Sequence, residues 1–198
     1  MGQNYKMRHT AQRGFTMIEI IIVIVLIGVI GSLAANILFQ GSDIYVSETN
    51  RQGFVSEARS SFWRIMRESQ GQASSADFSS SGQKFLGLKN AKGETIDFLT
   101  ESTGEFKRRL NDGNYNVLSN SLSYSDSEFS YFDNNFNKIN VSQSDLSNEA
   151  AETVHLIKLD LIFLKNENLN NEDKLSLSSY VYPLNFGLGK NMSYHNYE

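Results

Sequence analysis

The chain opens with a long apolar stretch that gives way, after about residue 40, to a mixed polar and apolar pattern. From Ile20 to Phe39 there are 20 residues without a charged side chain, and most of them are Ile, Val, Leu or Ala. At about 1.5 Å rise per residue, a helix of this length spans the roughly 30 Å hydrocarbon core of a bilayer. The pattern predicts one membrane-spanning helix near the amino terminus.

The helix is predicted to continue beyond the apolar stretch. Apolar residues then recur at the 3.6-residue period of one helix face, while arginine and glutamate fall mainly on the other faces. The members of this apolar stripe are Phe54, Ala58, Phe62, Ile65 and Met66. We expect the helix to end near Gln70-Gly71, because glycine is a usual residue at a helix stop.

After residue 82 the pattern changes to the period of β-strands. Phe85–Lys89 and Glu94–Thr100 flank the four-residue loop Asn90–Gly93, which predicts a β-hairpin. The clearest strand after it alternates apolar residues with Lys158 and Asp160. The full set of further strands that we expect is Tyr115–Leu118, Ser121–Ser125, Phe129–Asp133, Lys138–Val141, Thr153–Leu164 and Leu175–Tyr182.

An antiparallel sheet packed on the second half of the long helix is the simplest architecture for these elements. The helix stripe needs an apolar partner, and the sheet needs one covered face. The sequence therefore predicts an α+β fold with a long amino-terminal helix, whose first half spans a membrane and whose second half is amphipathic and packs on the sheet. Trp63, beside the stripe, is expected to pack at the seam between helix and sheet.

The short segment before the apolar stretch carries a specific motif. Residues 13–19 read Arg-Gly-Phe-Thr-Met-Ile-Glu, and Glu19 is the first acidic residue of the chain. Residues 8–40 resemble the processing site and membrane segment of type IV prepilins and pseudopilins. A secretory signal peptide has a shorter apolar region followed by a small-residue cleavage site, whereas no such site follows here. The apolar segment is therefore expected to stay on the mature protein.

The resemblance implies how the chain is processed and assembled. A prepilin peptidase would cut between Gly14 and Phe15 and methylate the new amino terminus at Phe15. The glutamate at the position of Glu19 would pair with the positively charged amino terminus of a neighbouring subunit and set the register of assembly. A carboxylate deep in the membrane costs about 2.5–3.5 kcal/mol on insertion scales, which favours a functional reason for its presence. A place in the first helical turn lowers this cost, because the helix dipole favours negative charge there.

The same resemblance implies three regions of the chain, and the basic residues before the apolar stretch imply its orientation in the membrane. Residues 1–14 are the expected leader, 15–41 the transmembrane or filament-core helix, and 42–198 a globular domain that includes the second half of the helix. Lys6, Arg8 and Arg13 precede the apolar stretch, so the positive-inside rule keeps the amino terminus in the cytoplasm. We expect a single-pass inner-membrane protein with a periplasmic domain, and a cell-surface filament is its alternative location.

The second half of the chain has a weaker resemblance. Residues 116–139, 154–164 and 175–185 are similar to the sheet region of minor pilins and of the J-type pseudopilin of type II secretion. Residues 57–69, in which arginines flank apolar side chains, are similar to the helix of those proteins. The absence of cysteine excludes the disulfide that many major pilins form, and this favours a minor subunit.

Composition and motifs argue against several other functions. Loss of the leader lowers Lys and Arg from 18 to 15 against 22 Asp and Glu, a net charge of −7, so nucleic-acid binding is not expected as the main role. His9, His155 and His195 do not have the spacing of metal ligands, and no catalytic motif is found. We expect His155 to be a partly buried strand residue. No enzyme activity, catalytic residue, metal or cofactor is predicted.

Two further residue groups have a structural and a functional interpretation. The runs 111–114, 133–135 and 170–173 are rich in Asn and Asp and could bind Ca²⁺, but they lack the spacing of a calcium loop and are interpreted as turns. The second group is aromatic and could form a recognition surface, although alternate members must be core. It comprises Tyr124, Phe129, Tyr131, Phe132 and Phe136.

These observations favour a minor pilin or pseudopilin, a structural subunit of a type IV pilus or type II secretion pseudopilus, in a priming or tip complex. Its partners would be the prepilin peptidase, other major and minor pilin subunits and inner-membrane lipid. One alternative is a binding module at a filament tip that contacts a surface, DNA or cargo, which surface aromatics outside the core would support. The other is a membrane-anchored periplasmic sensor that never polymerises.

Overall fold

The computed structural model describes residues 14–141, 145–165 and 174–184. The chain divides into two compact units, Met1–Thr49 and Asn50–Glu198. Helix α1 (Met17–Gln70) belongs to both units and is α-helical along its whole length, including Gly28 and Gly31. The predicted helix end at Gln70 is confirmed.

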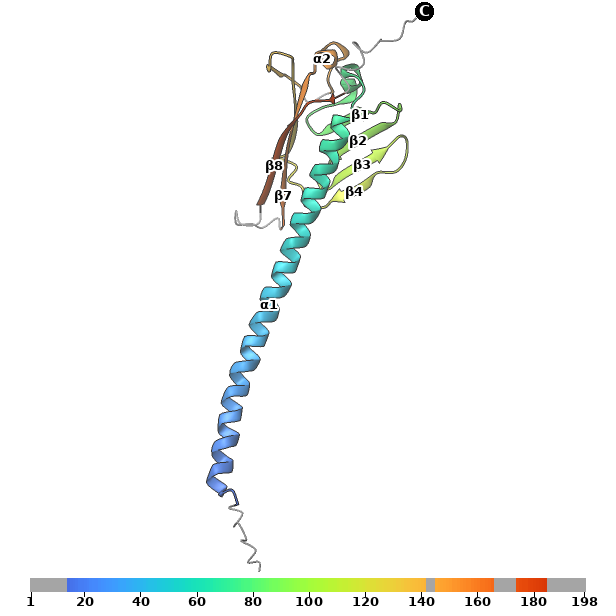
Figure 1. Cartoon of the computed structure of the whole chain (residues 1–198). Coiled ribbons are helices and arrows are strands. Elements are labelled where there is room, and N and C mark those ends of the chain that lie inside the picture. The colour runs from blue at the N-terminus through green and yellow to red at the C-terminus, as the bar shows by residue number, and fades with distance from the viewer. Residues whose placement is uncertain (1–13, 142–144, 166–173, 185–198) are drawn as a thin grey trace, which may run out of the picture. The chain divides into compact units, whose positions relative to one another are not determined.

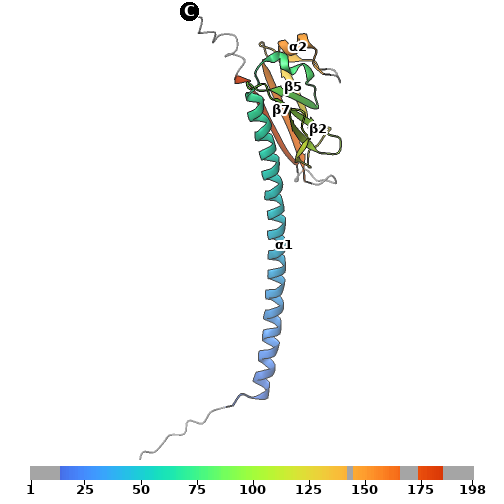
Figure 2. The ribbon, with the colours of Figure 1, turned by 90° about the vertical axis from the view of Figure 1, so that its right-hand side faces the viewer.

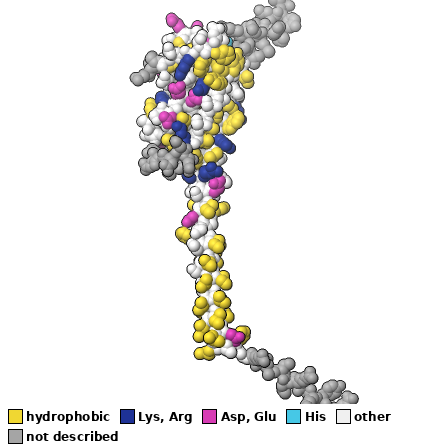
Figure 3. Space-filling model, turned by 90° about the vertical axis from the view of Figure 1, so that its left-hand side faces the viewer, with side chains coloured by type: hydrophobic (Ala, Val, Ile, Leu, Met, Phe, Trp, Pro, Cys, Tyr) yellow, Lys and Arg dark blue, Asp and Glu magenta, His cyan; other side chains and the backbone are white. Residues whose placement is uncertain are grey.

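In the first unit, the apolar side chains of α1 are exposed on every side. Ile18 to Val46 contribute no buried residue, and Leu38, for example, is 73% exposed. Figure 3 shows hydrophobic side chains covering this part of the helix. The helix is long and apolar enough to cross a membrane. Exposed apolar surface of this extent is unfavourable in water, so this segment requires lipid or other apolar helices around it.

The second unit contains two four-stranded antiparallel sheets, which lie on different sides of the last turns of α1 (Figure 1). The first has the order β1-β2-β3-β4 and the second the order β6-β5-β7-β8. The 3-10 helix η1 (Ser75–Ser80) precedes the first sheet, and the short helix α2 (Asn148–Glu152) precedes β7. The strands are β1 (Phe85–Lys89), β2 (Thr95–Thr100), β3 (Phe106–Leu110), β4 (Asn116–Ser119), β5 (Glu128–Phe132), β6 (Lys138–Ile139), β7 (Leu156–Leu164) and β8 (Lys174–Val181).

The predicted α+β class is confirmed, but the strands form two sheets where the sequence predicted one. The chain between β4 and β5 is the reason. The sequence predicted a strand at Ser121–Ser125 in this segment, and that prediction is wrong. Leu122 alone forms an isolated bridge, to Phe163, and Tyr124–Asp126 is a turn. This segment leads the chain from β4 of the first sheet to β5 of the second. Figure 2 gives a second view of the two sheets, with β2 of the first and β5 and β7 of the second labelled.

Other strand predictions hold with small shifts. The hairpin at Asn90–Gly93 is confirmed, and Gly93 adopts the positive φ of 82° that its turn requires. The strand expected at Thr153–Leu164 begins only at Leu156, because Thr153 still belongs to the end of α2, where its backbone N–H donates to the carbonyl oxygen of Ala150 at 3.2 Å.

Strand β3 was not predicted, because its sequence Phe-Lys-Arg-Arg-Leu does not alternate. Its three basic side chains are instead held by acidic partners. Lys107 Nζ lies 2.8 Å from a carboxylate oxygen of Glu101, Arg109 pairs with Asp97, and Arg108 Nε lies 2.9 Å from Glu68 Oε2 on α1. The last pair joins the first sheet to the helix.

The core forms where the apolar stripe of α1 meets both sheets. Ala58, Phe62 and Ile65 are buried, and Phe54 and Met66 pack against the same cluster, so the predicted stripe is confirmed. They share one continuous core with side chains of both sheets, including Phe98, Phe106, Phe129, Leu159 and Phe163. Ser61 adds a polar link, because its Oγ donates to the carbonyl oxygen of Leu118 at 2.9 Å.

Two side chains lie elsewhere than expected. Trp63 is 62% exposed, so its predicted place at the seam is wrong. One residue along a helix turns the side chain by about 100°, which carries Trp63 away from the face of buried Phe62. His155 is exposed just before β7 and packs its ring edge-on against Tyr182, so the expected partial burial in a strand is also wrong.

The aromatic group of the second sheet divides as the strand period requires. Phe129 and Tyr131 are fully buried, whereas Tyr124 and Phe136 are exposed and Phe132 is half-buried. The hydroxyl of Tyr131 donates to the carbonyl oxygen of Gly82 at 2.9 Å, and burial raises the pKa of this phenol. This bond ties the second sheet to the segment that leads into β1.

The outer edge of β1 is covered by two buried polar side chains. Ser81 Oγ accepts from the backbone N–H of Gly87 at 3.0 Å and donates to the carbonyl oxygen of the same residue at 3.1 Å. Gln72 Oε1 accepts from the N–H of Lys89 at 2.7 Å, and the carbonyl oxygen of Lys89 accepts from the N–H of Ala73 at 2.8 Å. The main-chain groups at this edge are therefore satisfied within the molecule.

The stripe yields a stability prediction. Phe62→Asp should lower the free energy of unfolding of the second unit by about 3–5 kcal/mol, because it removes a buried ring and leaves a carboxylate among apolar side chains. Ser60→Asp, on an exposed position of the same helix, is the matched control and should change stability by less than about 0.5 kcal/mol. Urea unfolding of the full chain in detergent would measure both, and equal midpoints for Phe62→Asp and the parent would contradict the packing.

Candidate processing and assembly site

Gly14 and Phe15 lie immediately before α1, in residues without regular secondary structure. Both are exposed, and the Phe15 side chain is 81% exposed. A Cβ added at Gly14 would meet no atom within 4 Å. The fold of this chain therefore does not require glycine at this position, and any strict requirement for it must come from a partner that binds the segment.

Thr16 and Glu19 form a reciprocal cap at the start of α1. Glu19 Oε2 accepts from the backbone N–H of Thr16 at 2.8 Å and from its hydroxyl at 3.0 Å. Thr16 Oγ1 in turn accepts from the backbone N–H of Glu19 at 3.4 Å. The N–H of Thr16 is satisfied in this way, and the N–H of Glu19, which also donates to the carbonyl oxygen of Thr16 at 3.1 Å, gains a second acceptor.

The sequence analysis missed this cap although its signal was present. Thr-x-x-Glu before an apolar run is the signature of a capping box. Glu19 was expected to bind a neighbouring chain and to benefit from the helix dipole, but no contact with Thr16 was predicted. Within the described residues, Oε2 accepts both hydrogen bonds from Thr16. The carboxylate is thus oriented toward the amino-terminal end of the helix with one oxygen available for a second donor.

Several predicted features fall outside the described residues. These are the leader up to Arg13 with Lys6, Arg8 and His9, the polar run 170–173, and His195. The two remaining Asn- and Asp-rich runs form turns, as expected. Asp133 Oδ1 accepts from the backbone N–H groups of Asn135 and Asn137, each at 2.8 Å, and Asn111 has a positive φ of 50°.

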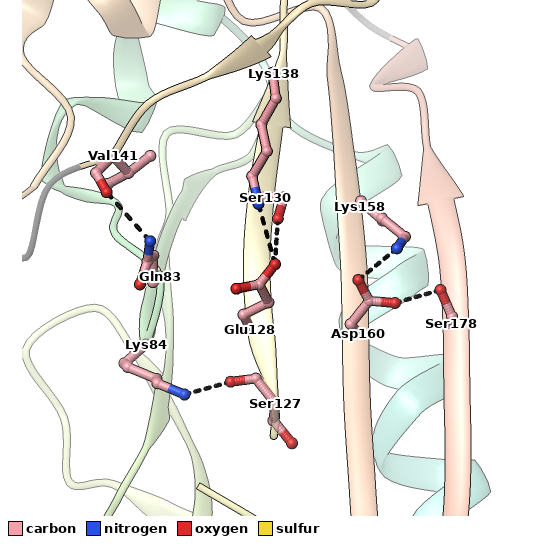
Figure 4. Close-up of polar contacts among 10 residues, drawn as sticks. All are labelled: Gln83, Lys84, Ser127, Glu128, Ser130, Lys138, Val141, Lys158, Asp160 and Ser178. Carbon is pink, nitrogen blue, oxygen red and sulfur yellow. Dashed lines mark hydrogen bonds and ion pairs between the residues drawn. The ribbon is translucent and has the colours of Figure 1, made fainter. Parts of the chain in front are cut away.

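The outward carboxylates of the second sheet are bound by neighbouring side chains, as Figure 4 shows. Glu128 Oε1 accepts from Lys138 Nζ at 3.1 Å and from Ser130 Oγ at 3.0 Å. Burial opposes ionisation of Glu128, but these hydrogen bonds lower its pKa on balance. Asp160 is held by Lys158 at 2.7 Å and by the hydroxyl of Ser178. Both carboxylates are thus engaged by side chains of their own sheet and act as structural partners.

The described residues contain no group of three or more His, Cys, Asp or Glu side chains that could hold a metal ion. The side-chain amine of Lys84 is bound by main-chain groups, because its Nζ donates to the carbonyl oxygens of Tyr124 and Ser127. Burial lowers the pKa of Lys84, and Glu128 and Asp126 oppose this. Its role in the described structure is to hold the turn between the two sheets.

Comparison with protein families finds one match. The model of the prokaryotic N-terminal methylation motif matches residues 9–35, which include Gly14, Phe15 and Glu19 and most of the apolar stretch. No curated protein matches the chain. The matched residues, the exposed Gly14–Phe15 bond and the apolar helix that begins directly after it agree with one another. The chain carries a prokaryotic N-terminal methylation motif, and this match supports a prepilin or pseudopilin of the type IV kind.

Proposed function

We propose that this protein is a minor pilin or pseudopilin, a structural subunit of a type IV pilus or a type II secretion pseudopilus that acts in a priming or tip complex. The observation that carries the proposal is the methylation motif followed at once by a capped, membrane-capable helix. The globular unit adds no metal cluster in its described residues, and the carboxylates of Glu128 and Asp160 on its second sheet are engaged in structural contacts. A structural role fits these features better than an enzymatic one.

Processing is proposed to occur at the bond between Gly14 and Phe15. A prepilin peptidase removes residues 1–14 and methylates the amino group of Phe15. The bond lies in an exposed segment without helix or strand, which a peptidase can bind in an extended form. Cleavage leaves Thr16 as the second residue, so the cap between Thr16 and Glu19 is retained in the mature chain.

Residues 15–41 are proposed to anchor the protein in the inner membrane, with the amino terminus in the cytoplasm and residues 42–198 in the periplasm. The basic leader supports this orientation by the positive-inside rule. During assembly the helix exchanges lipid for the helices of other subunits. Gly28, Gly31, Ala34 and Ala35 are small and exposed along it, and small residues allow helices to approach closely in an apolar medium.

Glu19 is proposed to set register by binding the amino terminus of a neighbouring subunit through its second oxygen. An ion pair of this kind is favourable in a low-dielectric surrounding only when both charges are satisfied together. The intramolecular contact with Thr16 holds the carboxylate ready while the subunit is alone. The charge is therefore never without a hydrogen-bond donor in the membrane.

A second candidate function is a binding module at the filament tip. Aromatic side chains outside the core favour it. Tyr180 is 58% exposed and Tyr182 49% exposed on the outer face of the second sheet, and the ring of Phe132 lies 5.8 Å from that of Tyr180. Figure 3 shows exposed hydrophobic side chains gathered on the globular part of the chain. The third possibility, a sensor that never polymerises, would leave the leader uncleaved.

The processing prediction concerns Gly14. Gly14→Leu should leave the fold unchanged, because the position is open, but should block cleavage and methylation in the host. Mass spectrometry of the wild-type protein should give a mature amino terminus at Phe15 with one added methyl group. Gly14→Ala, a smaller change, serves as the graded control. Normal maturation of the leucine variant would remove the main support for the proposed processing site.

The assembly prediction separates the two contacts of Glu19. Glu19→Ala and Glu19→Gln should both insert and be processed, and both should reduce incorporation into filaments by about tenfold or more, since about 1.4 kcal/mol is a factor of ten. Glutamine keeps an oxygen that can accept from Thr16 but has no charge. Cross-linking yield with other subunits would measure incorporation. If Glu19→Gln assembled like wild type, the carboxylate would act as a helix cap alone.

The test of the minor role is abundance. Deletion of the gene should reduce filament number or secretion sharply, while the protein itself is scarce in sheared filaments. A major pilin must form long identical stacks, whereas a minor subunit acts in few copies. Quantitative proteomics of purified filaments would measure the ratio. If this chain were the most abundant subunit, the minor role would be wrong and membership of the pilin family would stand.

A further inference from the structure

The outer strands of the two sheets differ in how their edges are protected. The edge of β1 is covered by Ser81 and Gln72, as described above. Strand β4 has four residues and its pairing with β3 shifts register, and β6 has only two residues. Strand β8 has eight residues that pair with β7 alone and in unbroken register. It is the one long open edge among the described residues.

The register identifies which main-chain groups of β8 face outward. On β7, the carbonyl oxygen of Ile162 accepts from the N–H of Ser123, and the N–H of Leu164 donates to the carbonyl oxygen of Ser121. The main-chain N–H and C=O groups of the even-numbered residues of β7 therefore point away from β8. In an antiparallel pair, the residues opposite them also face away from their partner strand. The residues of β8 opposite Ile162, Asp160 and Lys158 are Ser176, Ser178 and Tyr180. Their N–H and C=O groups therefore line the open edge.

This edge lacks the devices that usually prevent another strand from pairing. Proteins protect edges with bulges, prolines, short strands or charged side chains. Strand β8 has no register shift, its one lysine is the first residue, and Pro183 lies beyond its end. Ser176 and Ser178, at the centre of the edge, carry small side chains that leave the main chain accessible.

A groove on the inner side of β8 would receive the side chains of an added strand. It is lined by Leu175 of β8 and by residues of α1 that include Arg51, Val55, Arg59 and Trp63. Leu175 and Val55 are half-buried, and Trp63 is exposed in the isolated chain. Because side chains alternate along a strand, every second residue of an added strand would point toward this groove.

The charges of the groove define the chemistry of its occupant. Its two ionisable lining residues, Arg51 and Arg59, are basic. Arg67 also lies beside Trp63, whereas the neighbouring Arg64 forms an ion pair with Glu68 at 3.6 Å. The protein as a whole is acidic, with a net charge of −4. A basic groove with apolar walls fits acidic and apolar side chains on one segment.

We propose that β8 binds an extended segment of a partner protein, rich in acidic and apolar residues in alternation, which adds to the second sheet as a further strand. Main-chain hydrogen bonds to Ser176, Ser178 and Tyr180 supply affinity, and the groove between β8 and α1 selects the side chains. This is a binding site additional to the proposed role as a filament subunit, and it does not depend on cleavage or polymerisation.

The test uses the purified full chain in detergent and a nine-residue synthetic peptide of alternating valine and glutamate. Trp63 is the only tryptophan of the chain and lines the groove, so its fluorescence reports binding. The parent should bind this peptide, and a peptide of alternating valine and lysine should bind at least about tenfold more weakly. Absence of binding, or equal binding of the two peptides, would overturn the proposal.

A pair of variants isolates the main chain of the edge. Ser178→Pro removes the outward N–H, which an edge strand tolerates, and should weaken binding by about tenfold or more. Ser178→Ala loses the same hydroxyl contact with Asp160 but keeps the N–H, and should bind within about twofold of the parent. Equal binding by the proline variant would contradict strand addition.

Two controls test whether misfolding of the Ser178→Pro variant or self-association of the protein could explain the loss of peptide binding. A peptide methylated on the backbone nitrogens that face β8 should fail to bind the unaltered protein, whatever the fate of Ser178→Pro. Sedimentation of the parent without peptide should show a monomer. A dimer of the parent that is lost in the Ser178→Pro variant is not expected. If such a dimer forms, the occupant of the edge is a second copy of this chain, and the proposed partner segment is wrong. None of these outcomes bears on the prepilin assignment.

Discussion

The burial of one helix stripe against two sheets is the interaction on which the globular unit depends. Ala58, Phe62 and Ile65 belong to a core to which both sheets contribute, so one face of α1 packs against side chains of both sheets. The same helix has apolar side chains on every side in its first half. One continuous element therefore needs two apolar surroundings: its own sheets for the stripe, and lipid or other helices for the rest.

The start of the helix meets a related constraint on charge. A carboxylate next to a membrane-capable segment is costly unless hydrogen-bond donors satisfy it. Thr16 supplies two donors to a single oxygen of Glu19, and the helix dipole favours negative charge at this end. This arrangement makes the residue compatible with the membrane before assembly and leaves it geometrically able to accept a donor from a neighbour.

Features set by local sequence could be predicted, and features set by pairing between distant segments could not. The helix stripe, its end at Gln70 and the hairpin at Asn90–Gly93 follow from periodicity and turn residues, and the methylation motif is contiguous. Strand β3 carries adjacent basic residues that are satisfied only by distant acidic partners such as Glu68. The division into two sheets depends on the turn at Tyr124–Asp126, which the local alternation of apolar residues concealed. For the site, the positions of Gly14, Phe15 and Glu19 were available from sequence, but the cap was overlooked.

The side chains that cover the edge of β1 also determine how many sheet edges of the molecule can pair with a strand of another molecule. With Ser81 and Gln72 in place, the described residues offer one long edge, at β8. Two copies of a body with one such edge can pair edge to edge only once, and growth then stops. A body with two would join the next copy end to end without closure, which is the route to open fibres. The polar side chains of Ser81 and Gln72 thus keep pairing of this kind self-terminating in a protein whose ordered polymerisation is proposed to proceed through its helix.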